Sequence, residues 1–234
     1  MASLVAYYQQ LVDLPAAQGL CALVGLPKLA PYWPALLGLA GFFQLLRLSS
    51  NTLSSLVFGA KFDKLSVRQK YDWGIRVVSQ VHALVVVVLA VPIFFKEELL
   101  RDTLYGFNDY TAWRPSLQYY GASFIMFEAS TIFLNINWWL DKLGMTGSRL
   151  QLYNASVLLF LYFTVRIVFG TYMSFMLFND LKTQGTQTSA VLYYFYRIAN
   201  HSILGLSYYW FYLMIAAVKK RFPAKVVENA KKVA

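Results

Sequence analysis

Five long apolar stretches constrain this chain more than any other feature of its sequence. They cover residues 35–58, 77–95, 117–140, 152–178 and 191–218, and each is close to the roughly 20 residues that a helix needs to cross a bilayer. Lipid offers no hydrogen-bond partners to a free backbone, so segments of this kind form helices. The sequence therefore predicts an all-α fold, a polytopic integral membrane bundle with about five transmembrane helices.

The composition also indicates a protein that resides in lipid. Of the 234 residues, 58% are hydrophobic and only 14% are charged. A soluble domain is typically about 45–50% apolar and about 25% charged. Both departures favour a membrane environment over water.

The first 34 residues differ from the rest of the chain. Residues 4–26 are apolar but interrupted by polar side chains and a proline, which predicts an interfacial helix rather than a further span. The start lacks the pattern of a secretory signal, so the first span is expected to act as its own insertion signal. We divide the chain into a lumenal or interfacial segment at 1–34, a transmembrane domain at 35–218 and a basic cytosolic tail at 219–234.

The basic residues give the orientation. The net charge of +10 gathers beside the apolar stretches, as in residues 61–76 and 219–232, and not in a nucleic-acid-binding motif. No nucleic-acid partner is therefore expected. Thirteen basic residues fall in the first and third connections and the tail, against five on the opposite side. By the positive-inside rule, the C-terminus is predicted to be cytosolic and the N-terminus lumenal.

The last four residues include a lysine pair. Lys231 and Lys232 occupy the fourth and third positions from the C-terminus, as in the dilysine retrieval signal of endoplasmic-reticulum membrane proteins. Such a signal is read by a receptor and does not anchor the protein. The pair predicts residence in the endoplasmic-reticulum membrane, and the alternative is an ordinary basic tail.

The residues that commonly hold metals or activate nucleophiles form no known motif here. Cys21 is the only cysteine, so no disulfide within the chain is possible. His82 and His201, even together with Glu128, do not have metal-ligand spacing, and no HExxH occurs. No GxSxG elbow indicates an esterase. We expect neither a metal site nor a bound cofactor.

Several ionisable side chains lie inside the predicted spans, where a charge costs at least about 2.5–3.5 kcal/mol. They are Arg47, His82, Glu128, Arg166, Arg197 and His201. Arg197 and His201 are four residues apart and share a helix face. Asn135 follows Glu128 by seven residues and lies on the same face.

Two interpretations of these charges stay open. In the first, Glu128 and Arg166 form an interhelical ion pair, while Arg47 and Arg197 bond to helix carbonyls. In the second, the three arginines together with Glu128 and Asn135 bind an anionic ligand. A fatty-acyl carboxylate, a lipid phosphate or the phosphates of an acyl-CoA would have suitable chemistry.

The two histidines also allow two interpretations. His82 follows Ser79 by three residues on one helix face. A membrane histidine commonly bonds between helices, and it can also transfer protons. His82 and His201 are therefore either interhelical hydrogen-bonding residues or candidate catalytic bases.

Two stretches resemble the TLC domain, which ceramide synthases and translocating-chain-associated proteins share. Residues 73–83, WGIRVVSQVHA, resemble the family's Ser-x-x-His-Ala signature at Ser79, His82 and Ala83. Residues 127–138, FEASTIFLNINW, are similar to the Glu-x-Ser-Thr-x-Phe-x-Asn-x-x-Trp block of the branch that includes TLC-domain-containing transmembrane proteins. The resemblance extends over about residues 35–218 and implies a helical membrane protein of lipid metabolism.

The chain departs from the family pattern in one region. Family members normally carry two further spans between these blocks, with an Asp-bearing helix and then an adjacent histidine pair that ceramide synthases use in acyl transfer. Here the sequence passes directly from Trp113 to Arg114, and no two histidines are adjacent. The resemblance therefore implies a domain that is shortened between residues 113 and 114 and lacks the expected catalytic base.

Three functions follow as hypotheses. The first is a TLC-domain protein, catalytically impaired, that binds membrane lipid or fatty-acyl groups and contributes to lipid homeostasis. The second is an N-acyltransferase of ceramide-synthase type that joins a sphingoid base to the acyl group of acyl-CoA, with His82 or His201 as its base. The third is a translocon-associated membrane protein. The absent histidine pair favours the first hypothesis over the second, and the 127–138 block disfavours the third.

Overall fold

The computed structural model of the chain describes residues 2–23, 31–95, 118–183 and 190–222. Within these ranges every regular element is a helix and no strand occurs, which confirms the all-α class. Lys231, Lys232 and the junction between residues 113 and 114 lie outside the described residues.

The N-terminal segment forms two short helices that fold back on the start of the next helix. They are α1 (Ala2–Val12) and α2 (Pro15–Leu23), where a single interfacial helix was expected. Pro15 has no amide proton and so begins a new helix instead of continuing the first. The Trp33 indole donates to the Leu11 carbonyl at 3.0 Å, and this bond ties α1 to the following helix.

The next helical pair carries the first part of the membrane domain. Helix α3 (Trp33–Phe58) ends at Gly59, which has a φ of 50°, and the short α4 (Ala60–Asp63) follows. Helix α5 spans Val67–Phe95, so it begins well before the predicted residue 77. A reciprocal capping bond starts it: the Ser66 amide donates to Gln69 Oε1 at 2.9 Å, and the Gln69 amide donates to Ser66 Oγ at 3.3 Å.

The predicted third span is divided in the structure. Helix α7 (Gln118–Ile125) and helix α8 (Glu128–Lys142) are separated by a turn at residues 126–127. The predicted fourth span is continuous but irregular: α9 (Arg149–Leu161) leads through the π-helical segment η2 (Tyr162–Phe169) into α10 (Gly170–Thr183).

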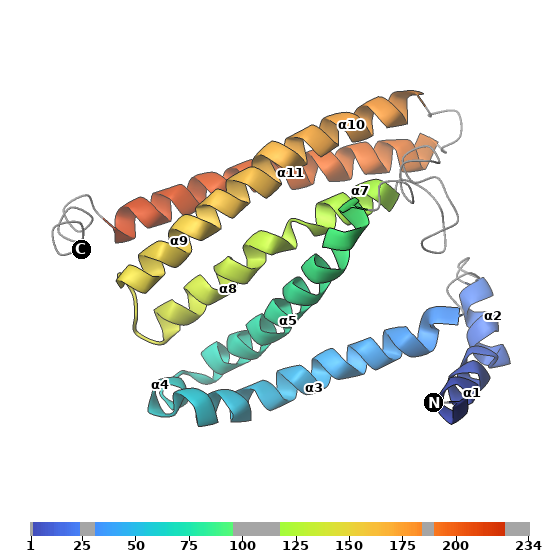
Figure 1. The fold of residues 1–234 in the computed structure, drawn as a ribbon, viewed down its shortest axis with the longest axis horizontal. Coiled ribbons are helices and arrows are strands. Elements are labelled where there is room, and N and C mark those ends of the chain that lie inside the picture. Colours follow the sequence, from blue (N-terminus) through green and yellow to red (C-terminus); the bar gives the residue numbers. More distant parts are fainter. Residues whose placement is uncertain (1, 24–30, 96–117, 184–189, 223–234) are drawn as a thin grey trace.

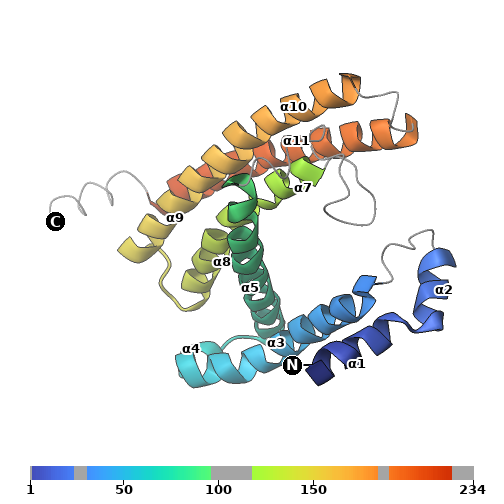
Figure 2. The ribbon, with the colours of Figure 1, turned by 45° about the vertical axis from the view of Figure 1, so that its right-hand side comes forward.

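Helix α11 (Ala190–Arg221) completes the domain and lies along the α9–α10 rod. In Figure 1, α3, α5, α8 and α9 follow one another as neighbours in chain order, with α11 beside α9 and α10. Figure 2 shows that α4, the α8–α9 turn and the last turn of α11 lie toward the same end of the molecule. These are the connections predicted to share one side of the membrane.

The helices expose much apolar surface, as expected of a protein in lipid. Three stretches in the described part are long and apolar enough to cross a membrane: Val67–Pro92, Arg149–Lys182 and Tyr193–Arg221. The polar residues between Gln44 and Ser55 lower the apolarity of α3. The spans expected at 35–58 and 117–140 therefore stay predictions, while the membrane-helical character of the chain is confirmed.

Candidate functional site: a polar pocket between α5 and α8

An aromatic cluster fixes the position of α5 against α8. Trp73 is only 2% exposed, and its ring lies 5.1 Å from Phe62, 6.1 Å from Trp138 and 5.9 Å from Trp139 between ring centroids. The Trp73 indole N–H donates to Ser54 Oγ of α3 at 2.8 Å. One side chain of α5 therefore links α3, α4 and α8, and it sets the rotation of α5 in the bundle.

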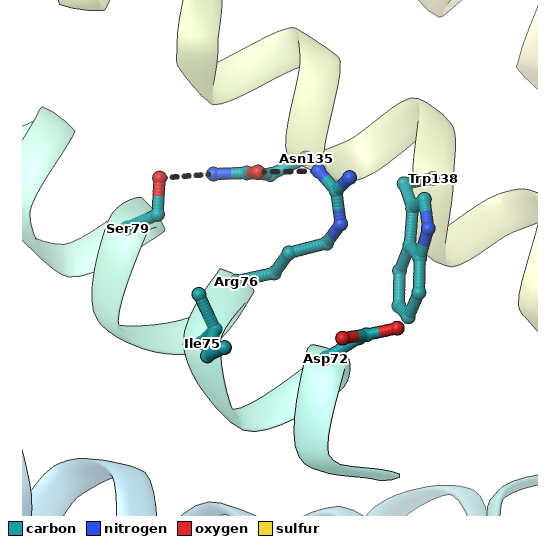
Figure 3. A pocket seen from close by; sticks show the side chains of 6 residues that line it. All are labelled: Asp72, Ile75, Arg76, Ser79, Asn135 and Trp138. Atoms are coloured by element: carbon teal, nitrogen blue, oxygen red, sulfur yellow. Dashed lines mark hydrogen bonds between the residues drawn. The ribbon is translucent and has the colours of Figure 1, made fainter. Parts of the chain in front are cut away.

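One turn beyond Trp73, a chain of polar contacts joins α5 to α8. Arg76 Nη1 donates to Asn135 Oδ1 at 3.0 Å, and Asn135 Nδ2 donates to Ser79 Oγ at 3.2 Å. Asn135 is 2% exposed, so both ends of its amide are used inside the protein. Figure 3 shows the three side chains in a row between the helices.

The same residues line a cavity of about 290 Å³. Its lining consists of Asp72, Ile75, Arg76, Ser79, Asn135 and Trp138. The guanidinium of Arg76 lies over the Trp138 ring, with Cζ 4.7 Å from the ring centroid. Asp72 and Arg76 are four residues apart on one face of α5, yet no ion pair within 4.0 Å joins them in the described part of the chain.

The pocket therefore presents two opposite charges that no direct ion pair joins. The guanidinium can donate to a phosphate or a carboxylate, and the Asp72 carboxylate can accept from an ammonium group. Asp72 and Arg76 lie about 8 and 14 Å along the helix from Val67. The pocket thus extends from one end of the candidate span toward its interior.

Of the predicted site residues that the structure describes, only Asn135 lines this pocket. Sequence reasoning missed Arg76, which it assigned to the loop before the second span. The signal was present, because Asp72, Arg76 and Ser79 follow the i, i+4, i+7 spacing of one helix face. A search for apolar stretches excluded this first part of α5 because of its charges.

Arg166 has a structural explanation that the sequence did not suggest. Its Nε lies 3.2 Å from the Phe127 carbonyl and 3.0 Å from Ser130 Oγ, and its Nη2 lies 3.4 Å from Thr131 Oγ1. Phe127 precedes α8 at the break between α7 and α8, and its carbonyl also accepts from Ser130 Oγ at 2.9 Å. Arg166, held on the π-helical segment, therefore ties η2 to the start of α8.

The expected ion pair between Glu128 and Arg166 is therefore wrong. Among the described residues, no contact within 4.0 Å joins the two charged groups. Arg166 uses its donors on α8 oxygens instead. Glu128 lies in the first turn of α8, where the helix dipole stabilises a carboxylate without a basic partner.

Within the described residues, neither the Arg47 nor the Arg197 side chain bonds to a helix carbonyl, contrary to the first interpretation. Arg47 Nε donates to Gln44 Oε1 at 3.2 Å. Arg197 Nη1 donates to the Tyr193 hydroxyl at 2.8 Å, and its guanidinium lies over the Phe178 ring. Arg197 is exposed and distant in the chain from the α5–α8 pocket.

The two histidines contact different helices. His82 is exposed and its ring lies edge-on to Phe43 of α3, with centroids 6.1 Å apart. His201 Nδ1 lies 2.7 Å from the Arg197 carbonyl of its own helix, and its ring stacks on Phe178 of α10 at 4.5 Å. Neither lines the pocket. The described residues contain no cluster of three potential metal ligands.

Comparison with known proteins finds a similarity to the TLC domain. The family profile described as TLC domain matches residues 109–216. An uncharacterised TLC domain-containing protein of Schizosaccharomyces pombe is 26% identical over 243 aligned residues, which cover 86% of this chain and 83% of the relative. The aligned length exceeds the whole chain, so the relative has residues without a counterpart here. No solved structure matches.

The two stretches that resembled the family in sequence also pack together. Ser79 of the first is hydrogen-bonded to Asn135 of the second, and Trp73 contacts Trp138 and Trp139. The profile match covers the second stretch and the helices after it, while the first stretch precedes it. Residues 109–216 of this chain thus match the TLC domain, and the family that carries this domain includes lipid-handling membrane proteins.

Proposed function

We propose that this protein binds membrane lipid through the α5–α8 pocket and contributes to membrane lipid homeostasis without acyl-transfer chemistry. The observation that carries the proposal is the presence of Asp72 and Arg76, opposite in charge and not ion-paired, in one cavity between the two family stretches. A headgroup with both a phosphate and an ammonium, as in phosphatidylethanolamine, would give each charge a partner.

Energetics support a zwitterionic ligand. A charge taken from water without a partner costs several kcal/mol, and pairing with hydrogen bonds offsets that cost. Arg76 uses only Nη1 on Asn135 within the described residues, so its other donors can reach a phosphate. Figure 3 shows Asp72 near the end of the Trp138 ring system that lies away from the Arg76 guanidinium. In that position its carboxylate would accept hydrogen bonds from the ammonium group of the same headgroup.

The size of the α5–α8 pocket indicates that it binds the headgroup of a lipid and not its acyl chains. Pockets for drug-sized ligands start at about 300 Å³, so 290 Å³ admits a headgroup and not a whole diacyl lipid. The acyl chains would lie along the apolar surface of α5. Ile75, which lines the pocket, is itself 44% exposed.

The positions of the histidines favour binding over catalysis. Ceramide synthesis needs a base within hydrogen-bond reach of the attacking amine. His82 packs on Phe43, and His201 bonds to its own helix, so neither stands beside the charged pocket residues. Acyl-CoA and a sphingoid base are therefore less suitable ligands for this chain than a glycerophospholipid headgroup.

Lipid retention tests the proposal. The full chain, purified in mild detergent, would be offered equal amounts of phosphatidylethanolamine and phosphatidylglycerol, and bound lipid would be counted by native mass spectrometry. The wild-type protein should retain phosphatidylethanolamine. Asp72→Asn and Arg76→Gln should each retain less phosphatidylethanolamine than the wild-type protein. Asp13→Asn, in the turn after α1, is the control for a lost carboxylate; equal retention in Asp72→Asn and Asp13→Asn contradicts the proposal.

We place the protein in the endoplasmic-reticulum membrane with its C-terminus in the cytosol, on the basis of the basic connections and the lysine pair. In sealed microsomes, protease should remove a C-terminal tag and spare an N-terminal one. Replacing Lys231 and Lys232 with serine should release the protein to later compartments. The reverse protection pattern would contradict the orientation, and an unchanged distribution would contradict retrieval.

A further inference from the structure

A second cleft lies on the other flank of α5, against α3. Its volume is about 230 Å³, and its lining consists of Arg47, Asn51, Val67, Lys70, Tyr71 and Gly74. None of these residues also lines the α5–α8 pocket. The first turns of α5 therefore separate two distinct cavities.

The charge of this cleft is entirely positive. Arg47 and Lys70 are its two charged side chains, and none of the described residues that line it is acidic. Arg47 has one hydrogen bond, from Nε to Gln44, and its guanidinium lies 5.5 Å from the Tyr71 ring centroid. The Lys70 ammonium has a ring contact, 5.5 Å from the centroid of Phe62. The terminal nitrogens of both cations thus have no anionic partner in the described part of the protein.

The packing of α3 on α5 holds the cleft in shape. A Cβ at Gly74 would lie 3.0 Å from Ser50 Oγ, 3.3 Å from the Arg47 carbonyl and 3.4 Å from Arg47 Cγ. Ser50 is 2% exposed and donates to the Arg47 carbonyl at 2.7 Å. Because Gly74 has no side chain, α3 and α5 can approach closely. The aliphatic part of the Arg47 side chain can then lie against α5.

We propose that the α3–α5 cleft binds an anionic phosphate group, carried by a membrane lipid such as phosphatidic acid. A guanidinium and an ammonium facing one cavity are the donors that recognise phosphate, and Asn51 and Tyr71 add neutral donors. The cleft is at the start of the candidate span Val67–Pro92, which is the level at which lipid phosphates lie. Basic groups at that level attract anionic lipid.

The ligand class differs from that of the α5–α8 pocket for a clear reason. Asp72 gives that pocket a place for an ammonium group, whereas the α3–α5 cleft would leave an ammonium beside two cations. The cleft should therefore select net-negative lipids, while the pocket selects zwitterionic ones. Each site can fail its test independently of the other.

The test uses the full chain in detergent, with retained lipid counted by native mass spectrometry. Four lipids are compared: phosphatidic acid, phosphatidylglycerol, phosphatidylethanolamine and uncharged diacylglycerol. Each basic residue near an anionic headgroup contributes about a fivefold change in affinity. The double variant Arg47→Gln, Lys70→Gln should thus retain phosphatidic acid about 30-fold less tightly. Its retention of phosphatidylethanolamine should be unchanged.

The control variant loses two positive charges, as the Arg47→Gln, Lys70→Gln variant does, from residues near the start of α5. Lys64 and Arg68 are exposed and line neither site, so Lys64→Gln with Arg68→Gln should keep the phosphatidic acid. Equal losses in the two double variants would overturn the proposal, as would diacylglycerol binding that matches phosphatidic acid. Lys70→Gln alone, which removes no hydrogen bond within the described residues, should still weaken retention about fivefold if the double variant unfolds.

A soluble phosphate is the other possible source of the same chemistry. Thermal unfolding of the wild-type chain in millimolar inorganic phosphate, against chloride at equal ionic strength, separates the sources. One outcome is that inorganic phosphate stabilises the wild-type chain and the Lys64→Gln, Arg68→Gln control but not the Arg47→Gln, Lys70→Gln variant. If no protein then retains phosphatidic acid, that result assigns the cleft to soluble phosphate. Stabilisation that is equal in all three proteins, again without lipid retention, contradicts a phosphate site.

Discussion

The contact between α5 and α8 and the packing of α11 show two ways of holding helices together in lipid. Between α5 and α8, the buried Trp73 and Asn135 make specific aromatic and hydrogen-bond contacts. Helix α11, in contrast, has only 6% of its most apolar stretch buried. Its contacts include the stacking of Phe211 on Tyr162 and of His201 on Phe178, the hydrogen bond of the Tyr208 hydroxyl to Thr171, and the ion pair of Arg221 with Asp141.

This difference teaches where structural specificity comes from in such a protein. Lipid tails are as apolar as leucine, so burying apolar surface does not by itself drive one helix onto another. Close packing and polar contacts decide which helices meet. The α5–α8 contact has both and forms the candidate site, while α11 offers an apolar surface to lipid.

The largest effect is expected from Trp73. Trp73→Ala removes the ring that joins α3, α4 and α8 and should destabilise the protein by about 3–5 kcal/mol. Trp210→Ala on α11, where the side chain is 55% exposed, should have little effect. Thermal unfolding in detergent measures both; similar losses would mean that the α5–α8 contact is no more specific than that of α11.

Arg166 should come next. Arg166→Met leaves the Phe127 carbonyl at the α7–α8 break without its charged donor, at an expected cost of about 1.5–3 kcal/mol. Glu128→Gln should cost less, because Glu128 has no ion pair with Arg166 to lose in the described structure. A rescue of Arg166→Met by Glu128→Gln would restore the ion-pair interpretation.

Asn135 should have an intermediate effect. Asn135→Leu removes the bonds to Arg76 and Ser79, and hydrogen bonds between membrane helices contribute about 0.6–2 kcal/mol each. Ser79→Ala removes only one of them and should cost about half as much. Comparing the melting temperatures of the two single variants and the double variant tests whether they act as one network: the double variant should resemble Asn135→Leu.

The smallest effect should come from the polar end of α11. Arg221 Nη2 lies 2.7 Å from Asp141 Oδ2, with both side chains partly exposed. Exposed pairs contribute about 0.2–1 kcal/mol and weaken with salt. Arg221→Met should lower the melting temperature slightly at low ionic strength and not at high. A salt-independent loss would show that the arginine packs instead of pairing.

Asp141, the partner of Arg221, should be more sensitive. Its Oδ1 also accepts from Gln151 Nε2 at 2.6 Å and from Thr146 Oγ1 at 3.1 Å, and Gln151 is fully buried. Asp141→Ala should therefore cost more than Arg221→Met, since it leaves a buried amide without its acceptor. Equal losses of stability in the two variants would mean that only the ion pair with Arg221, and not the bonds to Gln151 and Thr146, makes Asp141 stabilising.

The apolar stretches by themselves determined the helical class, the membrane setting and most helix positions. Helices α3 and α11 begin and end within a few residues of the stretches at 35–58 and 191–218, because lipid leaves a backbone no other hydrogen-bonded form. The 127–138 block likewise indicated a resemblance to the TLC domain, and the family profile matches residues 109–216 around it.

The partners of the charged residues were decided only by the tertiary structure. Arg76 was assigned to a loop and lies in a pocket. One of the two interpretations paired Arg166 with Glu128, but Arg166 bonds to oxygens at the α7–α8 break. A hydropathy pattern records how apolar a stretch is, not how far its helix is rotated or where a neighbouring helix breaks. Those depend on the fit of Trp73 and Gly74 between helices distant in the chain, which sequence spacing does not contain.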